Sequence, residues 1–396
     1  MRLLYLTAEE WPTFRADIMV LFGKYLPRFG IYSDLLTEAS FTQAMSPWPG
    51  GKAITCQVPS NRAAHYIVKF LYQCKVLLTT NYDEYAAVQV RDMTIIALMA
   101  LMMCAIKKKP FFYWLSYPQS EGQIQRAKAR GMRAGMKYWF PLLQGLVGKW
   151  LLYRVILPKS DHIFVQSNNM LEALAKHGIS PTKMTPVPMG VDIEATQQSL
   201  SPIQLDDFKN KRVLVYLGTL DRVRQIEFLF GMLAIVRQRV PNVLLVLAGD
   251  TEDAEHRAWL RRESQRLGVA ESVHWTSWLP MQEAWRYVLA AEVGLSPFPR
   301  GYLLDMASPT KAVEYMAFGL PVVANDNPDQ QQAIAESGAG LCVPMTTEAF
   351  ANATIKLLED DQLRASMSVL GKQYISQHRN YCQLAELLAR AYQQRV

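Results

Sequence analysis

The sequence is short of the features that mark secreted, zinc-binding or membrane-spanning proteins. Its cysteines are five in number and lie far apart: Cys56, Cys74, Cys104, Cys342 and Cys382. An odd count without a CxxC pair argues against a disulfide framework or a zinc site, and favours a reducing cytoplasm. The most apolar early stretch, residues 93–106, is shorter than the ~20 residues needed to cross a bilayer, so it predicts a buried helix. The first residues predict a strand, with no signal-peptide pattern.

Several sequence motifs for metal and nucleic-acid binding are also absent. The sequence has no DxD or HxxxH motif, so no metal site is expected. It also has no helix-turn-helix, RNP-like or zinc motif, so no nucleic-acid partner is expected. Low-complexity segments and internal repeats are missing too, which excludes disordered and solenoid classes.

Acidic residues are scarce in one segment. Residues 107–159 hold eleven Lys and Arg against the single acid Glu121. Within residues 126–157 these cations alternate with tryptophan, phenylalanine and leucine, a pattern typical of helices that lie on anionic membranes. An ordinary helix that packs on a sheet and leaves its cations in solvent remains the alternative.

The 396 residues exceed what one hydrophobic core usually supports, so two domains are expected. Short apolar runs alternate with helical patterns in both halves, which predicts two α/β, Rossmann-like, doubly wound domains that face each other across a ligand-binding cleft. We expect an N-terminal domain over 1–190, a second over 191–375, and a C-terminal helix at 376–396 that returns to the first. The expected strands of the two halves are 2–7, 31–36, 75–78, 87–90, 110–115 and 162–166, then 212–217, 243–248, 273–275, 293–296, 321–324 and 341–343.

The start of one predicted helix, at residues 308–314, indicates a ligand-binding site. Ser308 is a good N-cap and Pro309 a favoured first helical residue, so the N–H groups of residues 310–312 should be free. Such a terminus attracts a diphosphate, and Lys311 adds a positive charge. Glu314 lies one turn later and is suited to accept hydrogen bonds from sugar hydroxyls. A plain capped helix is the alternative.

In sequence order, several segments around this helix resemble the retaining glycosyltransferases of the GT-B fold, the family 4 or group 1 glycosyl transferases. The matching segments are Val213–Gly218, Leu245–Thr251, Ala291–Pro297, Glu314–Val323 and Gly338–Pro344, with weaker matches at Asp161–Ser167 and Pro186–Asp192.

The resemblance implies roles for matching residues. Glu314 stands where the family binds the donor ribose, and Thr310, Lys311 and Ala312, after Ser308 and Pro309, where it binds the diphosphate. Gly218 matches the glycine beside the phosphates. Thr219 occupies the family's arginine position and Arg224 its lysine position. Arg222, between them, is a candidate to replace the missing cation.

The sequence departs from the family at three places. Met306 stands where the first of two paired glutamates is expected, and Asp305 is one place off. Residues 8–13 replace the glycine-rich loop of the first domain. Ser116 stands near the position where the family often has a histidine. Candidates for acceptor or sugar contacts lie at expected strand ends: Glu9, Glu10, Arg91, Asp92 and Ser116.

The resemblance implies a hexosyltransferase-type enzyme (EC 2.4) that takes a UDP- or GDP-sugar donor and retains the anomeric configuration. Such an enzyme needs no cofactor beyond this donor substrate. A lipid-linked or polysaccharide acceptor fits the basic segment, and with it a cytoplasmic protein bound peripherally to the inner face of the membrane. Two alternatives remain: a sugar-nucleotide 2-epimerase-like enzyme, and a non-catalytic nucleotide-sugar-binding scaffold.

Overall fold

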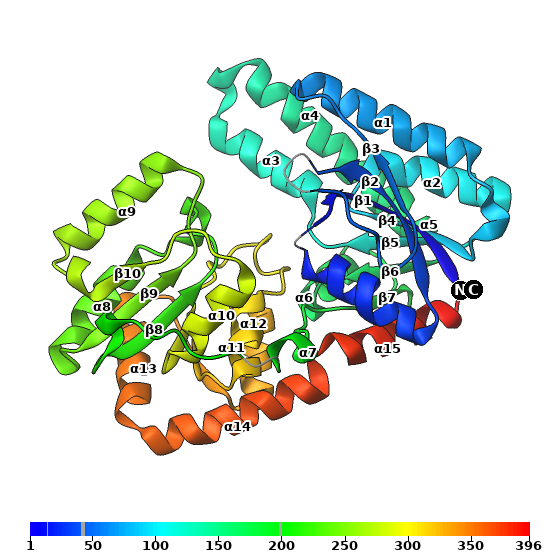
Figure 1. The fold of residues 1–396 in the computed structure, drawn as a ribbon. Coiled ribbons are helices and arrows are strands. Elements are labelled where there is room, and N and C mark those ends of the chain that lie inside the picture. The colour runs from blue at the N-terminus through cyan, green and yellow to red at the C-terminus, as the bar shows by residue number, and fades with distance from the viewer. Residues whose placement is uncertain (14, 41–43, 198–199) are drawn as a thin grey trace. The chain divides into compact units, whose positions relative to one another are not determined.

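The chain forms two compact units, each built on a parallel β-sheet between layers of helices (Figure 1). The computed structural model describes residues 1–13, 15–40, 44–197 and 200–396. Unit 1 consists of Met1–Pro188 and Tyr381–Val396, and unit 2 of Met189–Asn380. The predicted α/β class with two Rossmann-like domains is confirmed.

The sheet of unit 1 has the strand order β3-β2-β1-β4-β5-β6-β7, and all its strands are parallel. Its strands are β1 (Arg2–Trp11), β2 (Tyr32–Ala39), β3 (Ala53–Cys56), β4 (Ala87–Arg91), β5 (Phe111–Leu115), β6 (His162–Val165) and β7 (Met184–Pro186). The chain adds β2 and β3 on one side of β1 and then returns to add β4 on the other. The carboxyl ends of β1 and β4 therefore form the topological switch point of this sheet.

Helices cover both faces of this sheet. Its helices are η1 (Asp17–Tyr25), η2 (Leu26–Phe29), α1 (Arg62–Thr79), η3 (Tyr82–Glu84), α2 (Thr94–Lys107), α3 (Gln119–Arg130), η4 (Met132–Ala134), α4 (Met136–Leu151), η5 (Leu152–Ile156), α5 (Leu157–Lys159), α6 (Asn168–Lys176), η6 (Pro181–Lys183) and α15 (Tyr381–Gln393). One face buries an aromatic cluster in which the ring of Tyr392 from α15 lies 5.3 Å from Phe112 and 4.9 Å from Phe164. The last helix thus completes the core of unit 1 by burying its apolar stripe.

Three expectations for unit 1 were wrong. Residues 75–78 lie inside α1 instead of forming a strand, while β3 and β7 were not expected. The apolar run Val76–Leu78 resembles a strand because short apolar runs carry no decisive period. The helix expected at 93–106 exists as α2, but only one of its faces is buried, and Ile95, Met102 and Ile106 are exposed.

The sheet of unit 2 has the strand order β10-β9-β8-β11-β12-β13. Its strands are β8 (Arg212–Leu217), β9 (Val243–Ala248), β10 (Val273–Trp275), β11 (Val293–Ser296), β12 (Val322–Asn325) and β13 (Gly340–Val343), each within one residue of its expected bounds. The order reverses between β8 and β11, so the switch point of unit 2 lies at the carboxyl ends of these two strands.

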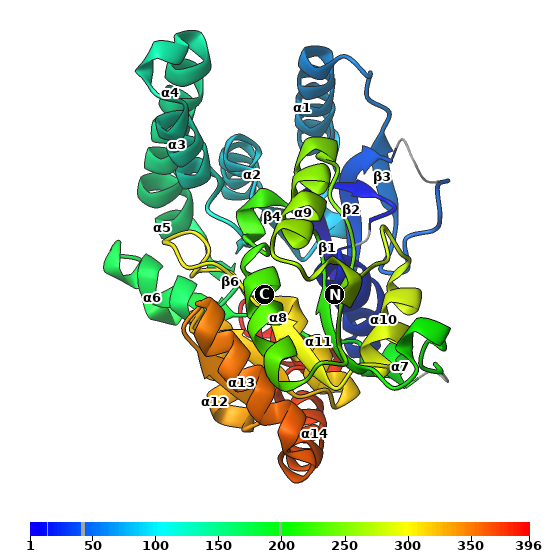
Figure 2. The same cartoon turned by 90° about the vertical axis from the view of Figure 1, so that its left-hand side faces the viewer.

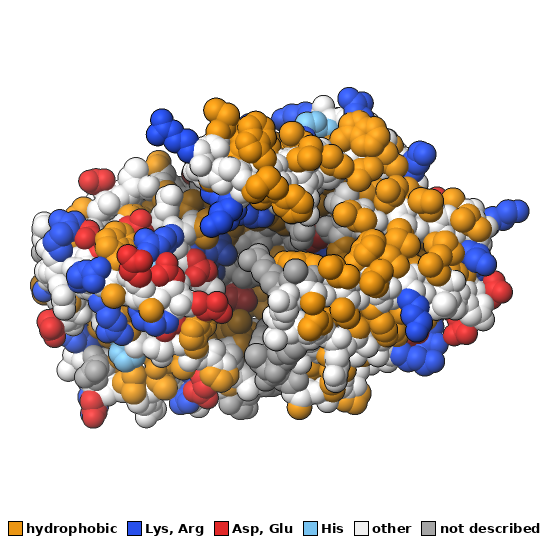
Figure 3. All heavy atoms as spheres, turned by 90° about the horizontal axis from the view of Figure 1, so that it is seen from above, with side chains coloured by type: hydrophobic (Ala, Val, Ile, Leu, Met, Phe, Trp, Pro, Cys, Tyr) orange, Lys and Arg blue, Asp and Glu red, His pale blue; other side chains and the backbone are white. Residues whose placement is uncertain are grey.

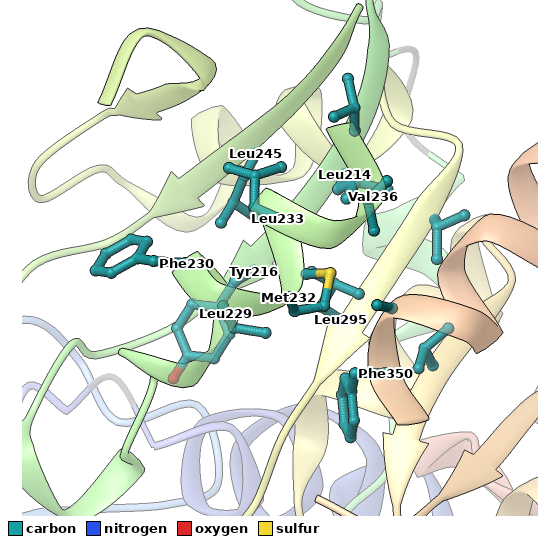
Figure 4. Close-up of a cluster of buried hydrophobic side chains, with 14 of the residues drawn as sticks. Leu214, Tyr216, Leu229, Phe230, Met232, Leu233, Val236, Leu245, Leu295 and Phe350 are labelled. Atoms are coloured by element: carbon teal, nitrogen blue, oxygen red, sulfur yellow. The ribbon is translucent and has the colours of Figure 1, made fainter. Parts of the chain in front are cut away.

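Unit 2 also contains helices, several of which bury apolar side chains on this sheet. They are α7 (Ile193–Thr196), η7 (Asp206–Phe208), η8 (Arg222–Arg224), α8 (Phe228–Arg239), α9 (Ala254–Arg266), η9 (Ala270–Ser272), α10 (Met281–Leu289), α11 (Thr310–Phe318), α12 (Pro328–Ser337), α13 (Thr347–Glu359) and α14 (Asp361–His378). Figure 4 shows the core on one face, where Leu229 and Leu233 of α8 and Phe350 of α13 pack on the side chains of β8, β9 and β11. This packing fixes the strand ends that carry the candidate site.

Candidate functional site

The candidate site of unit 2 lies at its switch point, where two glycine turns meet the start of α11. Gly218 follows β8 with φ +136°, and Gly249 follows β9 with φ +144°. A Cβ atom on Gly249 would lie 2.1 Å from the carbonyl oxygen of Gly218, so only glycine lets the two turns approach this closely.

Lys311, in the first turn of α11, lies directly over the first of these turns. A Cβ atom on Gly218 would be 3.2 Å from its Cε and 3.6 Å from its Nζ. No side chain caps the N-terminus of α11, whose N-cap residue is Pro309. Buried Lys311 and Ala312 and partly exposed Thr310 form its first turn. The ammonium group and the helix dipole therefore place positive charge at one point, which suits a diphosphate.

A second cation joins Lys311. The Arg224 guanidinium lies 4.9 Å from the ring centre of Phe298, and Lys311 Nζ lies 5.8 Å from the same ring. Burial and the nearby charge of Arg224 lower the pKa of Lys311 to about 7. A buried lysine next to a half-buried arginine is typical of a binding site for a multivalent anion.

Glu314 follows Lys311 by one helical turn and is half-buried. Burial raises the pKa of its carboxyl to about 7, and the charge of Lys311 opposes this shift. Once it is ionised, this carboxyl group can accept hydrogen bonds from the hydroxyl groups of a nucleotide-sugar donor.

The orientation of α11 is fixed by Tyr315. Its hydroxyl accepts a hydrogen bond from the Leu217 N–H at 2.7 Å, immediately before Gly218. Its ring lies over Gly294 of β11, where a Cβ atom would come within 2.4 Å of it. Gly294 thus lets α11 lie close enough to the sheet for Lys311 to reach the Gly218 turn.

Ser308 does not cap α11, and that part of the expectation was wrong. Its Oγ donates to Asp329 Oδ2 at 2.7 Å and accepts from the Met189 N–H at 2.9 Å. Asp329 also receives a hydrogen bond of 2.7 Å from Arg379, and both side chains are buried. Since this ion pair joins α12 to the end of α14, the segment before α11 is held by a network that no local sequence pattern reveals.

The loop between β11 and α11 is anchored by two buried amides. Asn325 accepts from the Phe298 N–H at 2.7 Å and donates to its carbonyl at 2.9 Å. Gln330 exchanges hydrogen bonds with Ser296 and donates to the Asn325 carbonyl. Sequence reasoning missed both residues, although Asn325 directly follows the apolar residues of β12.

The remaining donor-side candidates lie around this centre. Arg222 is largely exposed and pairs with Asp253 at 3.1 Å, so it braces a loop next to α9 while Arg224 faces Lys311. Asp305 forms two hydrogen bonds with Arg300, at 2.8 and 3.1 Å, and Met306 is buried. The carbonyl of Thr219 accepts from the Tyr216 hydroxyl at 2.9 Å.

Three acceptor-side candidates meet at the carboxyl ends of β4 and β5 in unit 1. Asp92 follows β4 with φ +58° and is buried. It accepts from the Ser116 N–H at 2.8 Å and from the Ser116 hydroxyl. Burial raises the pKa of its carboxyl, and the charge of Arg91 opposes the shift. Arg91 is itself buried, pairs with Asp17 at 2.7 Å and lies 3.7 Å from Asp92.

Glu9 and Glu10 were expected at a strand end, and they lie in the last three residues of β1, which continues to Trp11. Glu9 lies 3.6 Å from Arg15. Within the described ranges, no three His, Cys, Asp or Glu residues come together as a metal site would require. Metal independence stays a prediction.

The basic segment forms α3 and α4, an antiparallel pair that Figure 2 shows with α2 between it and α1. Only Gly145 of α4 is buried, while apolar side chains from Trp139 to Trp150 are exposed. Figure 3 shows hydrophobic side chains gathered over this part of unit 1.

Met136–Lys159 has the length and apolar composition of a membrane-crossing helix, with a mean hydropathy of 1.2. Its second half, from Leu152 to Leu157, is largely buried in the unit.

Residues 199–374 match the sequence profile of the family described as "Glycosyl transferases group 1". Over 187 residues the chain is 29% identical to a GDP-mannose-dependent alpha-(1-6)-phosphatidylinositol monomannoside mannosyltransferase of Mycolicibacterium smegmatis, an alignment that covers 46% of this chain and 48% of the relative. The chain thus spans about half the length of the curated relatives it matches. The resemblance found in the sequence is confirmed for this segment, and the narrower family 4 assignment stays a prediction.

Solved structures support the fold over the whole chain. A sucrose-phosphate synthase from Thermosynechococcus elongatus superposes with a TM-score of 0.71 at 16% identity, covering 100% of this chain and 99% of that one. HepE of Anabaena, solved in complex with UDP and glucose, superposes with a TM-score of 0.70 at 16% identity, covering 100% of both chains. At these identities the similarity shows the GT-B fold alone.

Proposed function

We propose that the protein transfers a sugar from a nucleoside-diphosphate sugar to a lipid-linked or polysaccharide acceptor, because residues 199–374 match the profile of the group 1 glycosyl transferases. The observation that carries this proposal is the position of Lys311, at the uncapped start of α11 and over the Gly218 turn. Arg224 adds a second cation there. The enzyme is of the hexosyltransferase type (EC 2.4).

The proposed reaction retains the anomeric configuration. The bond from the anomeric carbon to the diphosphate oxygen breaks, and a bond from that carbon to the acceptor oxygen forms on the same face of the sugar. The acceptor hydroxyl gives its proton to the departing diphosphate oxygen. Lys311 and Arg224 stabilise the negative charge that develops on this leaving group, so their contribution is electrostatic.

The donor is proposed to be a UDP- or GDP-sugar. Glu314 accepts hydrogen bonds from the ribose, and residues 308–312 with Gly218 and Thr219 surround the diphosphate. One relative is named as GDP-mannose-dependent, and HepE was solved with UDP, so the similar proteins support both bases.

The acceptor is proposed to be presented at an anionic membrane surface, with the protein bound peripherally to its cytoplasmic face. The exposed apolar side of α4 and the cations of α3 support this arrangement. Since η5 and α5 are held in the core of unit 1, lying on the surface keeps the unit folded, whereas crossing the bilayer would expose that core.

The test is a transfer assay with UDP-, GDP- and ADP-linked sugars and membrane-lipid acceptors, comparing wild type with Glu314→Ala. We expect one nucleotide sugar to be consumed with formation of a glycosylated lipid, and a large loss of turnover in the variant. Interconversion of the sugar without an acceptor would instead support an epimerase-like enzyme. Tight binding without turnover on any acceptor would support a scaffold.

A further inference from the structure

Unit 1 contains a cavity that the donor site does not use. It has a volume of about 430 Å³ and is bordered by α1, α2, α3 and α4, with Ala8 of β1 and Asp92 after β4. This volume falls within the roughly 300–1,000 Å³ of small-molecule sites. The cavity reaches the switch point between β1 and β4, which is where open α/β sheets bind ligands.

The outer part of the cavity is apolar and continuous with the exposed surface. Tyr66 and Phe70 of α1, Ile95 of α2 and Val147 of α4 all line it. Their side chains are also exposed, Tyr66 by 61% and Val147 by 49%, although each is large and apolar. The cavity therefore opens within the apolar surface of α1 and α4, and soluble proteins seldom leave such a surface exposed without a function.

The inner part of the cavity is polar. Buried Gln73 and Ser120 and half-buried Gln123 contribute amide and hydroxyl groups, and Asp92 lies among the lining residues with its buried carboxyl. A ligand that matches both parts has an apolar end toward the exposed side of α1 and α4 and a polar end toward the inner amide and hydroxyl groups. This is the polarity of a lipid whose headgroup enters first.

Two glycines of α4 shape this cavity. A Cβ atom on Gly148 would lie 2.6 Å from Ser120 Oγ, and one on Gly145 would lie 2.7 Å from Ile124 Cγ1. They bring α4 into close contact with α3, and the neighbouring Gln144, Val147 and Leu151 of α4 line the cavity. The spacing of glycines and apolar residues along α4 thus builds a cavity wall as well as an exposed surface.

We propose that this cavity binds the hydrocarbon chain of an anionic lipid, with its headgroup directed toward the amide and hydroxyl groups of Gln73, Ser120 and Gln123. The charge supports a lipid of this sign, because α3, α4 and their connection carry cations against the single acid Glu121. This inference deepens the proposed function, on which it rests for the identity of the chain as part of the acceptor. An apolar helix of a partner protein is the competing occupant.

The test is calorimetric titration of the full chain with dodecyl phosphate below its micelle concentration, and with butyl phosphate. Removal of methylene groups from water favours the longer chain only if the cavity takes it up. We expect dodecyl phosphate to bind once per chain and at least about tenfold more tightly than butyl phosphate. Equal affinities would mean that the phosphate alone is recognised, which would overturn the proposal.

Two matched variants locate the site. Val147→Trp fills the cavity, while Leu146→Trp changes the adjacent exposed residue of α4, which does not line it. We expect Val147→Trp to weaken dodecyl phosphate binding at least about tenfold, and Leu146→Trp to leave it unchanged. Thermal unfolding of both variants checks that each is folded. Equal binding by both would overturn the proposal, as would saturation by a partner-like amphipathic peptide in place of the lipid.

Titration with UDP and GDP separates this inference from the proposed function. If dodecyl phosphate binds as expected but no nucleotide does, the lipid cavity stands and the transferase proposal fails. If a nucleotide binds but dodecyl phosphate does not, the donor site stands and the lipid cavity is wrong.

Discussion

At the scale of single residues, Lys311 decides how the candidate donor site responds to pH. Its pKa is lowered to about 7 by burial and by the charge of Arg224. Above pH 7 the Lys311 side chain is therefore largely neutral in the free protein. A bound diphosphate favours the protonated form of this side chain. Nucleotide binding should therefore be linked to the uptake of a proton.

We predict that UDP or GDP binding at pH 8 takes up close to one proton, and that affinity falls up to about tenfold per pH unit as the pH rises above 7. The pKa of Glu314, raised to about 7, leaves that carboxyl largely ionised at pH 8, so it adds no uptake there. Calorimetry in buffers of different ionisation enthalpy measures the protons. Lys311→Arg stays charged and should bind with little pH dependence. An equally steep dependence in that variant would contradict this account.

Gly218 permits the close approach of Lys311. We predict that Gly218→Ala weakens nucleotide binding about tenfold or more, because its φ of +136° disfavours a side chain and the new Cβ would lie 3.2 Å from Lys311 Cε. Gly178→Ala is the control: its φ is also positive, at +87°, but its Cβ meets no atom within 4 Å. It should lower stability without changing affinity. Equal loss of affinity in both variants would assign the effect to backbone strain alone.

The sequence placed several candidate residues correctly, and their binding roles stay predictions, whereas other contacts of the site could not be predicted. Lys311, Gly218 and Glu314 follow from one helix start and one strand end, and the structure brings Lys311 to Gly218. The choice between Arg222 and Arg224 depends on side-chain direction. The pairing of Ser308 with Asp329 and Arg379 depends on residues at least 21 positions away. Local sequence propensity predicts neither the direction of these arginine side chains nor the long-range partners of Ser308.

At the scale of elements, the buried pair of Asp329 and Arg379 holds α12 and α14 around the segment that precedes α11. We predict that Asp329→Ala destabilises unit 2 by roughly 3–5 kcal/mol, because it leaves the Arg379 charge buried without its partner. Chemical denaturation measures this. Glu359→Ala, which removes the exposed pair with Arg239, should cost about 1 kcal/mol or less. Similar losses in the two variants would contradict a special role for the buried pair.

The element α4 should carry membrane binding. We predict that Leu143→Glu or Trp150→Glu lowers binding to phosphatidylglycerol vesicles at least about tenfold, because each change puts a charge where an apolar side chain would leave water. Val369→Glu, on α14, changes a residue of similar exposure and should bind as wild type does. Vesicle flotation measures the bound fraction. Unchanged flotation in both α4 variants would show that another surface binds the membrane.

The elements of unit 2 were easier to predict than those of unit 1. Each of its six strands ends before a glycine, a proline or a polar residue, and each was predicted within one residue. In unit 1, α1 and α4 expose many apolar side chains, so their periodicity does not separate a buried from an exposed face. The residues that obscured the prediction, such as those around Leu78, belong to the same apolar surface that suggests a lipid partner.

At the scale of the whole molecule, each unit carries one candidate site at its own switch point. Unit 2 offers cations and glycine turns for a nucleoside diphosphate, and unit 1 offers a polar and apolar cavity next to Asp92. The two-domain class was predictable from the alternation of strands and helices. The cavity was not, because it depends on how four helices that are separate in the sequence pack together.

The account rests on nucleoside-diphosphate binding at the start of α11. Its most direct test is calorimetric titration of the wild type, Lys311→Ala and Lys356→Ala with UDP, GDP and ADP, where Lys356 is an exposed lysine of α13. The account predicts that at least one nucleotide binds the wild type and Lys356→Ala equally, and binds Lys311→Ala at least about tenfold more weakly. Equal binding by Lys311→Ala, or no binding of any nucleotide to the wild type, would contradict it.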